Sequence, residues 1–146
     1  MKKNLLSLLL FLFASSCITL NNNFEGYYWR LVSIEGEAVP VFDQKSMSKK
    51  NAYITFQGSD RITGFSGCNT INAKFDRDHN VTHFLGVVAT KNKCTPEKNK
   101  IEQNFLTFLK MSEYMIINGN TLTIYNKNKD IVLIFKKEEA VSVKKI

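Results

Sequence analysis

The chain has 146 residues, 44% of them hydrophobic, and a net charge of +7 at neutral pH. This length fits one domain with a core of aromatic and aliphatic residues, together with any segment that is cleaved. The Lys residues are scattered along the chain, so the charge alone favours solubility over one dedicated anion-binding patch.

The N-terminus has the layout of an export signal. Lys2 and Lys3 precede an apolar run over residues 5–13, and the small residues ASS lead into Cys17. The apolar run is too short to span a bilayer, which distinguishes it from a transmembrane helix. We therefore expect residues 1–16 to be a cleaved signal peptide.

The residues before Cys17 resemble the lipobox of bacterial lipoproteins, in which the cysteine is acylated and becomes the first mature residue. Ala14 departs from the leucine that is commoner at its position. The resemblance implies lipidation of Cys17, with residues 17–26 as a tether; an ordinary cleaved signal with a free Cys17 is the alternative. Ile18, rather than an aspartate, after the cysteine favours the outer membrane.

Export changes what the basic charge implies. Cleavage before Cys17 would leave 18 Lys and Arg against 13 Asp and Glu, a net charge of +5. Anionic lipid or lipopolysaccharide surfaces suit such a charge, whereas nucleic acid is not expected as a partner of an exported protein. We expect a protein of the cell envelope that is attached to the membrane through its N-terminal lipid. It would face the periplasm or the cell surface, with an envelope protein or a lipid as its partner.

The first half of the mature chain predicts short strands separated by turns. Residues 35–50 are polar and contain a Gly and a Pro, which predicts a loop. Residues 76–80 form a predicted turn, and residues 81–90 form one or two strands broken at Gly86. The runs rich in β-branched and aromatic residues, typical of strands, are 27–34, 52–56, 61–65 and 70–75.

One later segment has helical periodicity. Thr95 is a suitable cap, and Pro96 and Glu97 suit the first turn, which predicts a helix over about 96–111. Its apolar stripe should face the core, with a partner-binding face as the alternative; the stripe consists of Ile101, Phe105, Phe108 and Leu109. The residues expected on the solvent side are Lys98, Glu102 and Lys110.

A hairpin with Asn118-Gly119 at its turn follows the helix, then a last strand over residues 131–135 and a charged tail over residues 137–146. The fold class is therefore α+β and mostly β. We expect a strongly bent antiparallel sheet or small open barrel of about seven or eight strands, covered by the one helix. The domain spans residues 27–136.

Of the three cysteines, one lies at the expected cleavage site and two lie in the mature domain. If Cys17 carries lipid, Cys68 and Cys94 remain, and a lone pair in an oxidising compartment predicts a disulfide. With 25 intervening residues, such a bond stabilises the fold by roughly 3.5 kcal/mol on the chain-entropy model.

Residues 61–70 read RITGFSGCNT and raise the question of an active site. Gly64 and Gly67 predict a bulge or a sharp bend. Asn69 tolerates left-handed backbone, and its side chain can bond a neighbouring turn. We interpret the segment as a structural corner, with ligand contact at Asn69 as the alternative.

The sequence signals for a catalytic or a metal-binding site are weak. Ser66 lacks the final glycine of a nucleophile elbow, because Cys68 occupies that position. A thiol nucleophile would need a nearby histidine, and only His79 and His83 exist. The spacing of these histidines from Cys68 and Cys94 matches no zinc motif. We expect no catalytic residue, no metal and no cofactor, and hence no enzyme.

Several aromatic residues could line a cavity or a binding surface, with ordinary core and edge packing as the alternative. They are Tyr27, Tyr28, Trp29, Phe42, Tyr53 and Phe65.

Taken together, these segments resemble the META domain, also called HslJ-like, over residues 27–136. The family pattern is a G-x-x-GCN corner followed by a T-x-x-x-C segment, a helix and a hairpin. The matching pieces are Trp29-Arg30-Leu31, the strand ending in Phe56, RITGFSGCN, ATKNKC (89–94), the helix and the final hairpin. Lys93 departs from the pattern, because many members have a bulky hydrophobic residue before the second cysteine.

The resemblance implies a bacterial envelope or secreted protein. Some members are heat-inducible and linked to novobiocin tolerance, and the molecular activity of the family is not established. We expect a lipid-anchored envelope protein with a binding or scaffolding domain, related to envelope stress or drug tolerance. The alternatives are a carrier of a small apolar ligand or lipid, held between helix and sheet, and a hydrolase or thiol enzyme.

Overall fold

The computed structural model describes residues 24–42 and 51–138. The expected signal peptide, Cys17 and the first part of the tether lie outside the described residues, as does the tail beyond residue 138. Within the described ranges, no helix is long and apolar enough to cross a membrane.

Nine antiparallel strands form one sheet that closes on itself, because β1 pairs with β9 as well as with β3. The strands are β1 (Tyr28–Ile34), β2 (Glu37–Ala38), β3 (Tyr53–Gln57), β4 (Arg61–Phe65), β5 (Thr70–Asp78), β6 (Val81–Ala89), β7 (Tyr114–Asn118), β8 (Thr121–Tyr125) and β9 (Ile131–Glu138). The ring is not a regular barrel, since β6 and β7 are paired only at Val81 and Tyr114. The expected fold class, mostly β with one helix, is confirmed.

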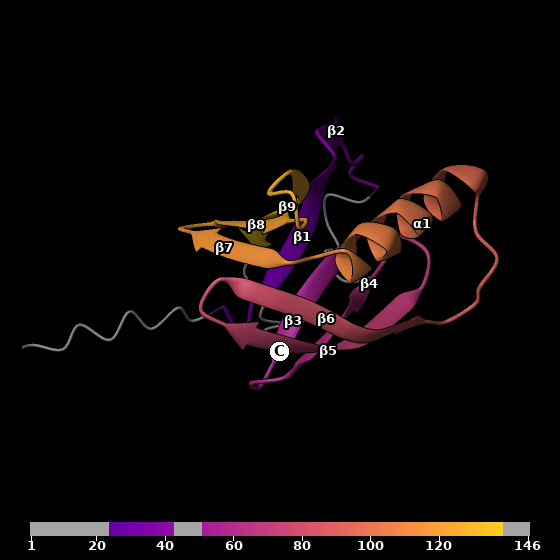
Figure 1. Ribbon diagram of the computed structural model, residues 1–146. Coiled ribbons are helices and arrows are strands. Elements are labelled where there is room, and N and C mark those ends of the chain that lie inside the picture. Colours follow the sequence, from indigo (N-terminus) through magenta and orange to yellow (C-terminus); the bar gives the residue numbers. More distant parts are fainter. Residues whose placement is uncertain (1–23, 43–50, 139–146) are drawn as a thin grey trace, which may run out of the picture.

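Helix α1 (Pro96–Lys110) lies against β6 and β9, on the side of the ring where β6 and β7 diverge (Figure 1). The Thr95 hydroxyl accepts a hydrogen bond from the backbone N–H of Lys98 at 3.4 Å, as a helix cap should. Phe105 and Leu109 are fully buried, which confirms that the apolar stripe faces the core.

Two polar segments form more regular structure than their sequences predict. β2 lies within residues 35–50, which we expected to be a loop, and pairs with the end of β1. β5 runs on to Asp78, so the expected turn over residues 76–80 shrinks to His79 and Asn80. The outward faces of both strands are polar, so their sequences have the composition of a loop although they pair with neighbouring strands.

The last strand is also longer than expected. β9 continues to Glu138, into the segment expected to be a charged tail, because it pairs with β1 from Leu133 to Glu138. The Arg30 guanidinium donates a hydrogen bond to the Glu138 carboxylate and holds the two strand ends together. β6 is likewise one continuous strand with a bulge, and is not broken at Gly86.

The interior of the ring is filled by side chains from the strands and the helix. Trp29 is 1% exposed, and its indole N–H donates to the Phe24 carbonyl at 2.9 Å. The Phe105 and Phe135 ring centroids lie 5.8 Å apart, which brings α1 directly against β9. The other fully buried large side chains are Leu31, Ile54, Ile62, Ile71, Leu109, Met115, Leu122, Ile124 and Leu133.

Tyr28 and Tyr53 are half-buried and alternate with the core residues Trp29 and Ile54, so they lie on the outer face of the ring. The Tyr28 and Tyr53 rings meet edge to face on β1 and β3, with their centroids 5.0 Å apart. Burial, and secondarily the neighbouring Tyr28, raise the pKa of Tyr53 above its ordinary value. These aromatics support the packing interpretation.

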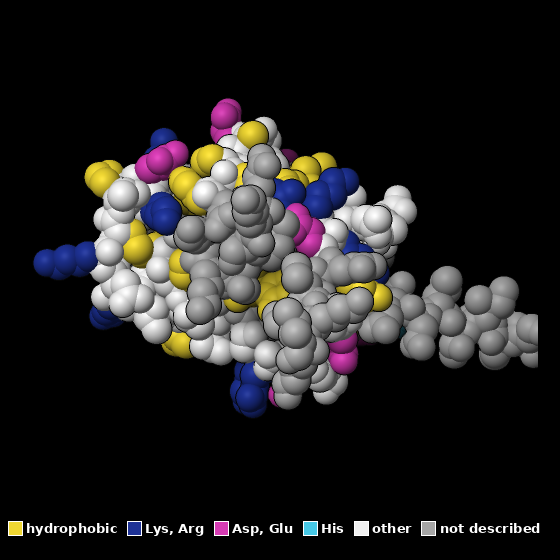
Figure 2. Space-filling view, turned by 180° about the vertical axis from the view of Figure 1, so that it is seen from behind, with side chains coloured by type: hydrophobic (Ala, Val, Ile, Leu, Met, Phe, Trp, Pro, Cys, Tyr) yellow, Lys and Arg dark blue, Asp and Glu magenta, His cyan; other side chains and the backbone are white. Residues whose placement is uncertain are grey.

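The charged side chains do not gather into one patch on the face seen in Figure 2. Lys and Arg are scattered around that face, with apolar side chains visible between them.

Candidate functional site: a disulfide-stapled corner

Two glycines shape the corner that follows β4, each for a different reason. A Cβ at Gly64 would lie 2.2 Å from the Tyr53 carbonyl oxygen, so glycine is required for β4 to approach β3. Gly67 has a φ of +96° and supplies the left-handed backbone. Asn69, which could tolerate the same conformation, does not adopt it, and the left-handed residue of the corner is Gly67, two positions earlier.

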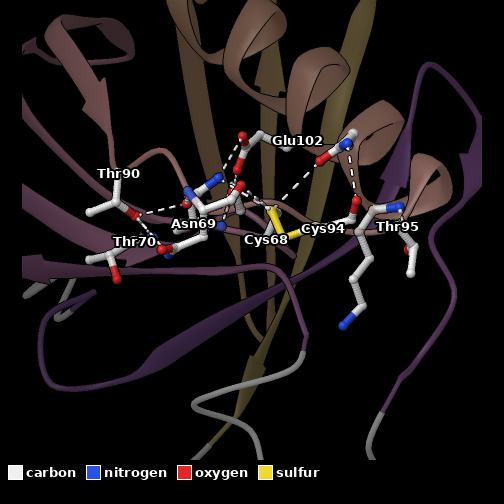
Figure 3. The surroundings of a disulfide bond; sticks show 11 residues. Cys68, Asn69, Thr70, Thr90, Cys94, Thr95 and Glu102 are labelled. Carbon is white, nitrogen blue, oxygen red and sulfur yellow. Dashed lines mark hydrogen bonds between the residues drawn. A yellow bond between two sulfur atoms is a disulfide. The ribbon is translucent and has the colours of Figure 1, made fainter.

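Cys68 and Cys94 form a disulfide with their Cα atoms 5.9 Å apart, within the usual range for such bonds. The expected pairing is therefore present in the structure. It joins the corner to the residue before the Thr95 helix cap, as Figure 3 shows. The Asn99 amide donates to the Cys94 carbonyl at 3.3 Å, so the first turn of α1 is fastened to the same point.

Asn69 is buried at the centre of the corner, and every hydrogen-bonding position of its amide is used (Figure 3). Its oxygen accepts hydrogen bonds from the Thr90 hydroxyl at 2.9 Å and the Asn92 backbone N–H at 2.7 Å. Its nitrogen donates to the Glu102 carboxylate at 3.0 Å and to the Cys68 sulfur at 3.3 Å. An amide accepts two and donates two such bonds, so this side chain has no capacity left for a ligand.

Ser66 is fully buried and belongs to the same network. Its hydroxyl bonds the Glu102 carboxylate, and its oxygen accepts from the Asn69 backbone N–H at 3.0 Å. A nucleophile must reach its substrate, and this hydroxyl is enclosed by the fold.

Glu102 is the member of the corner that sequence reasoning misses. We expected it on the solvent side of α1, but it is half-buried and turned toward Ser66 and Asn69. Its position three residues before Phe105 places it beside the apolar stripe. A carboxylate at the edge of the apolar stripe can reach polar groups that pack against the helix. The Asn and Ser of the corner need such partners, and this is the signal that could have identified Glu102.

The histidines contribute nothing to the corner. His79 lies in the turn between β5 and β6 and bonds Asp78 at 2.6 Å, while His83 Nδ1 lies 3.7 Å from a Glu113 carboxylate oxygen. Among the residues that the structure describes, no three His, Cys, Asp or Glu side chains gather in a way that could hold a metal ion.

A closed ring of antiparallel strands with one covering helix, and a Gly-Cys-Asn corner stapled to the start of that helix, defines a small disulfide-stapled β domain. The family model of the META domain matches residues 22–139, and the chain belongs to this family. No curated protein matches the chain.

Solved structures with the same fold have low sequence identity to the chain. A protein from Burkholderia xenovorans, solved by NMR, has 20% identity and a TM-score of 0.62 over 80% of this chain and 85% of its own. A second NMR structure has 21% identity and a TM-score of 0.60 over 77% and 90%. A DUF4847 family protein from Bacteroides vulgatus has 16% identity and a TM-score of 0.53 over 81% and 96%. At these identities the similarity extends to the fold alone.

Proposed function

We propose that the chain is a lipid-anchored protein of the cell envelope, and that its META domain is a binding or scaffolding module without catalysis. The observation that carries the second part is the use of the corner's reactive groups. The Ser66 hydroxyl is buried against Glu102, and the Cys68 thiol is consumed in a disulfide. The groups that could act as nucleophiles thus stabilise the fold instead.

The anchor is supported by the N-terminal sequence and by the disulfide. The apolar run over residues 5–13 and the small residues before Cys17 have the layout of a lipoprotein signal. A disulfide between Cys68 and Cys94 fits an oxidising compartment outside the cytoplasm. Ile18 favours the outer membrane, and a role in envelope stress or drug tolerance is in keeping with the family.

The test of the anchor is substitution of the cysteine. The full chain, expressed in a bacterium that processes lipoproteins, should fractionate with the membrane and carry an acylated Cys17 by mass spectrometry. Cys17→Ser should remain unprocessed and lose the acyl groups, and globomycin should block processing of the wild type. Ser16→Ala keeps a small residue before the cleavage site and is the matched control, with normal processing. Unchanged processing and membrane attachment in both Cys17→Ser and globomycin-treated cells would contradict the anchor.

A carrier with an apolar ligand between helix and sheet has less support. Phe105 and Leu109 of α1 are fully buried, and Phe105 packs directly on Phe135. An apolar ligand would therefore have to bind the outer surface of the ring.

A further inference from the structure

A hollow of about 550 Å³ lies on the outer face of β4, β5 and β6. Its lining includes small, aliphatic and basic residues. The residues in these three groups are Ala73 and Gly86, Leu85 and Val88, and Arg61 and Lys74.

A β-bulge in β6 produces the hollow. Lys74 of β5 faces Leu85, whereas Asn72, two residues earlier, faces Val88, so β6 has one extra residue here. Gly86 lies in the bulge with a φ of +60°, and no atom lies within 4 Å of the position that a Cβ would take. Leu85 and Val88 consequently both point outward, 53% and 61% exposed, with open space between them.

The basic side of the hollow is an unbalanced pair of cations. Arg61 on β4 stands directly opposite Lys74 on β5, and both are exposed. Like charges in this position destabilise a sheet. Within the described residues neither side chain has an ion-pair partner, and Asp76, the next outward residue of β5, faces His83 instead. An anion between Arg61 and Lys74 would relieve their repulsion.

We propose that this hollow binds an anionic phospholipid of the membrane to which the protein is attached. The phosphate would lie between Arg61 and Lys74, since guanidinium and ammonium groups donate strong hydrogen bonds to phosphate oxygens. The apolar part of the lipid would contact Leu85 and Val88, which otherwise expose aliphatic surface to water. This inference rests on the proposed envelope location, because it needs a phospholipid within reach.

The point at which the N-terminal segment enters the fold suits such a partner. The Phe24 ring lies 4.8 Å from that of Phe56, and Phe56 faces Ile62, the neighbour of Arg61. Six residues separate Cys17 from Phe24, and a chain of this length spans at most about 25 Å. A lipid on Cys17 would therefore hold this end of the domain close to the membrane surface.

Native mass spectrometry of the full chain tests the hollow. The protein is purified in dodecyl maltoside and mixed with equal amounts of phosphatidylglycerol and phosphatidylcholine that have the same acyl chains. Two cations at the headgroup should favour the anionic lipid by roughly fivefold or more. Arg61→Gln/Lys74→Gln should bring the ratio of the two adducts close to one. Lys110→Gln/Lys127→Gln removes the same charge from exposed positions elsewhere and should keep the wild-type ratio.

The apolar half of the hollow is tested separately. Leu85→Ser/Val88→Ser should reduce the adducts of both lipids and leave their ratio unchanged. Three results would overturn the proposal. The wild type could form equal amounts of the two lipid adducts, or both double-Gln variants could lose the preference for phosphatidylglycerol to the same extent. The third is a serine variant that binds as much lipid as the wild type.

The Cys17→Ser chain keeps this proposal distinct from the proposed anchor. It should lose membrane attachment in cells but retain the preference for phosphatidylglycerol in detergent. If Cys17→Ser changes nothing in cells while the purified protein still prefers phosphatidylglycerol, the anchor is wrong and the hollow stands. If the wild type shows no preference between the two lipids while Cys17→Ser loses membrane attachment, the hollow is wrong and the anchor stands.

Discussion

The stapled corner and the outer hollow lie on the same strands, but their polar side chains differ in whether they have partners within the protein. In the corner, the buried side chains of Ser66 and Asn69 have partners at every position. In the hollow, Arg61 and Lys74 are exposed and face each other without a counterion in the described part of the chain. Buried polar groups must be satisfied internally, whereas exposed ones remain able to bind another molecule. The motif that resembles an active site is thus the less suitable place for a ligand.

Removal of the disulfide should have the largest effect on this comparison. Cys68→Ala/Cys94→Ala should lower the free energy of unfolding by about 3.5 kcal/mol, because the bond restricts the unfolded chain. Urea unfolding followed by the fluorescence of Trp29, the only tryptophan and a buried one, measures this change. Cys17→Ser keeps the disulfide and is the control. A loss of less than about 1 kcal/mol would mean that the staple is not a principal support of the fold.

The two regions each contain a glycine, and the same substitution should separate them. Gly64→Ala forces a Cβ against the Tyr53 carbonyl and should cost about 3 kcal/mol. In Gly86→Ala the added Cβ lies in open space, so only the strain of a positive φ remains. This variant should lose about 1 kcal/mol of stability. Thermal unfolding of the two variants side by side gives the ranking. Equal losses would remove the distinction between a close backbone approach and an open bulge.

Two asparagines on the same polypeptide segment provide the next test. Asn69→Ala removes a buried amide and its four hydrogen bonds, among them those to Thr90 and Glu102, and should destabilise by about 2–3 kcal/mol. Asn72→Ala, at an exposed position beside the hollow, should change stability by less than about 0.5 kcal/mol. Amide hydrogen exchange at the start of α1 should rise in the first variant alone. If both variants unfold at the same urea concentration, the corner network contributes no net stability.

The smallest effect should have the opposite sign. Lys74→Gln removes the repulsion with Arg61 and should stabilise the fold by a few tenths of a kcal/mol, roughly 0.5 at most. The gain should shrink in high salt, because screening already weakens the repulsion in the wild type. Lys110→Gln is the control and should show neither the gain nor its salt dependence. A destabilised Lys74→Gln would show that this lysine has a structural partner.

The sequence predicts the fold class, the helix and the cysteine pair because each leaves a local pattern. The stripe around Phe105 repeats at helical spacing, and two cysteines remain once Cys17 is assigned to the lipid. The extent of β9 has no such pattern, since its last residues are charged and are held by distant β1. Long-range pairing thus extends strands beyond what their own composition indicates.

The parts of the site that were missed depend on geometry between distant segments. Glu102 has the polarity of a solvent-facing residue, and only the approach of Asn69 and Ser66 to the helix makes it a half-buried hydrogen-bond partner. Gly86 marks an interruption of the strand pattern, and a break and a bulge look alike until the register with β5 is known. Neither position could be assigned before the strands were placed together.

The most direct test of the central claim, that the corner is a staple and not a reactive centre, is differential alkylation of the cysteines. Protein from the envelope is alkylated under native conditions without reductant, then denatured, reduced and alkylated with an isotopically heavier reagent, and its peptides are mapped by mass spectrometry. We predict that Cys68 and Cys94 carry only the second label. Rapid labelling of Cys68 by the first reagent, in folded protein, would contradict the account and return this corner to the list of candidate active sites.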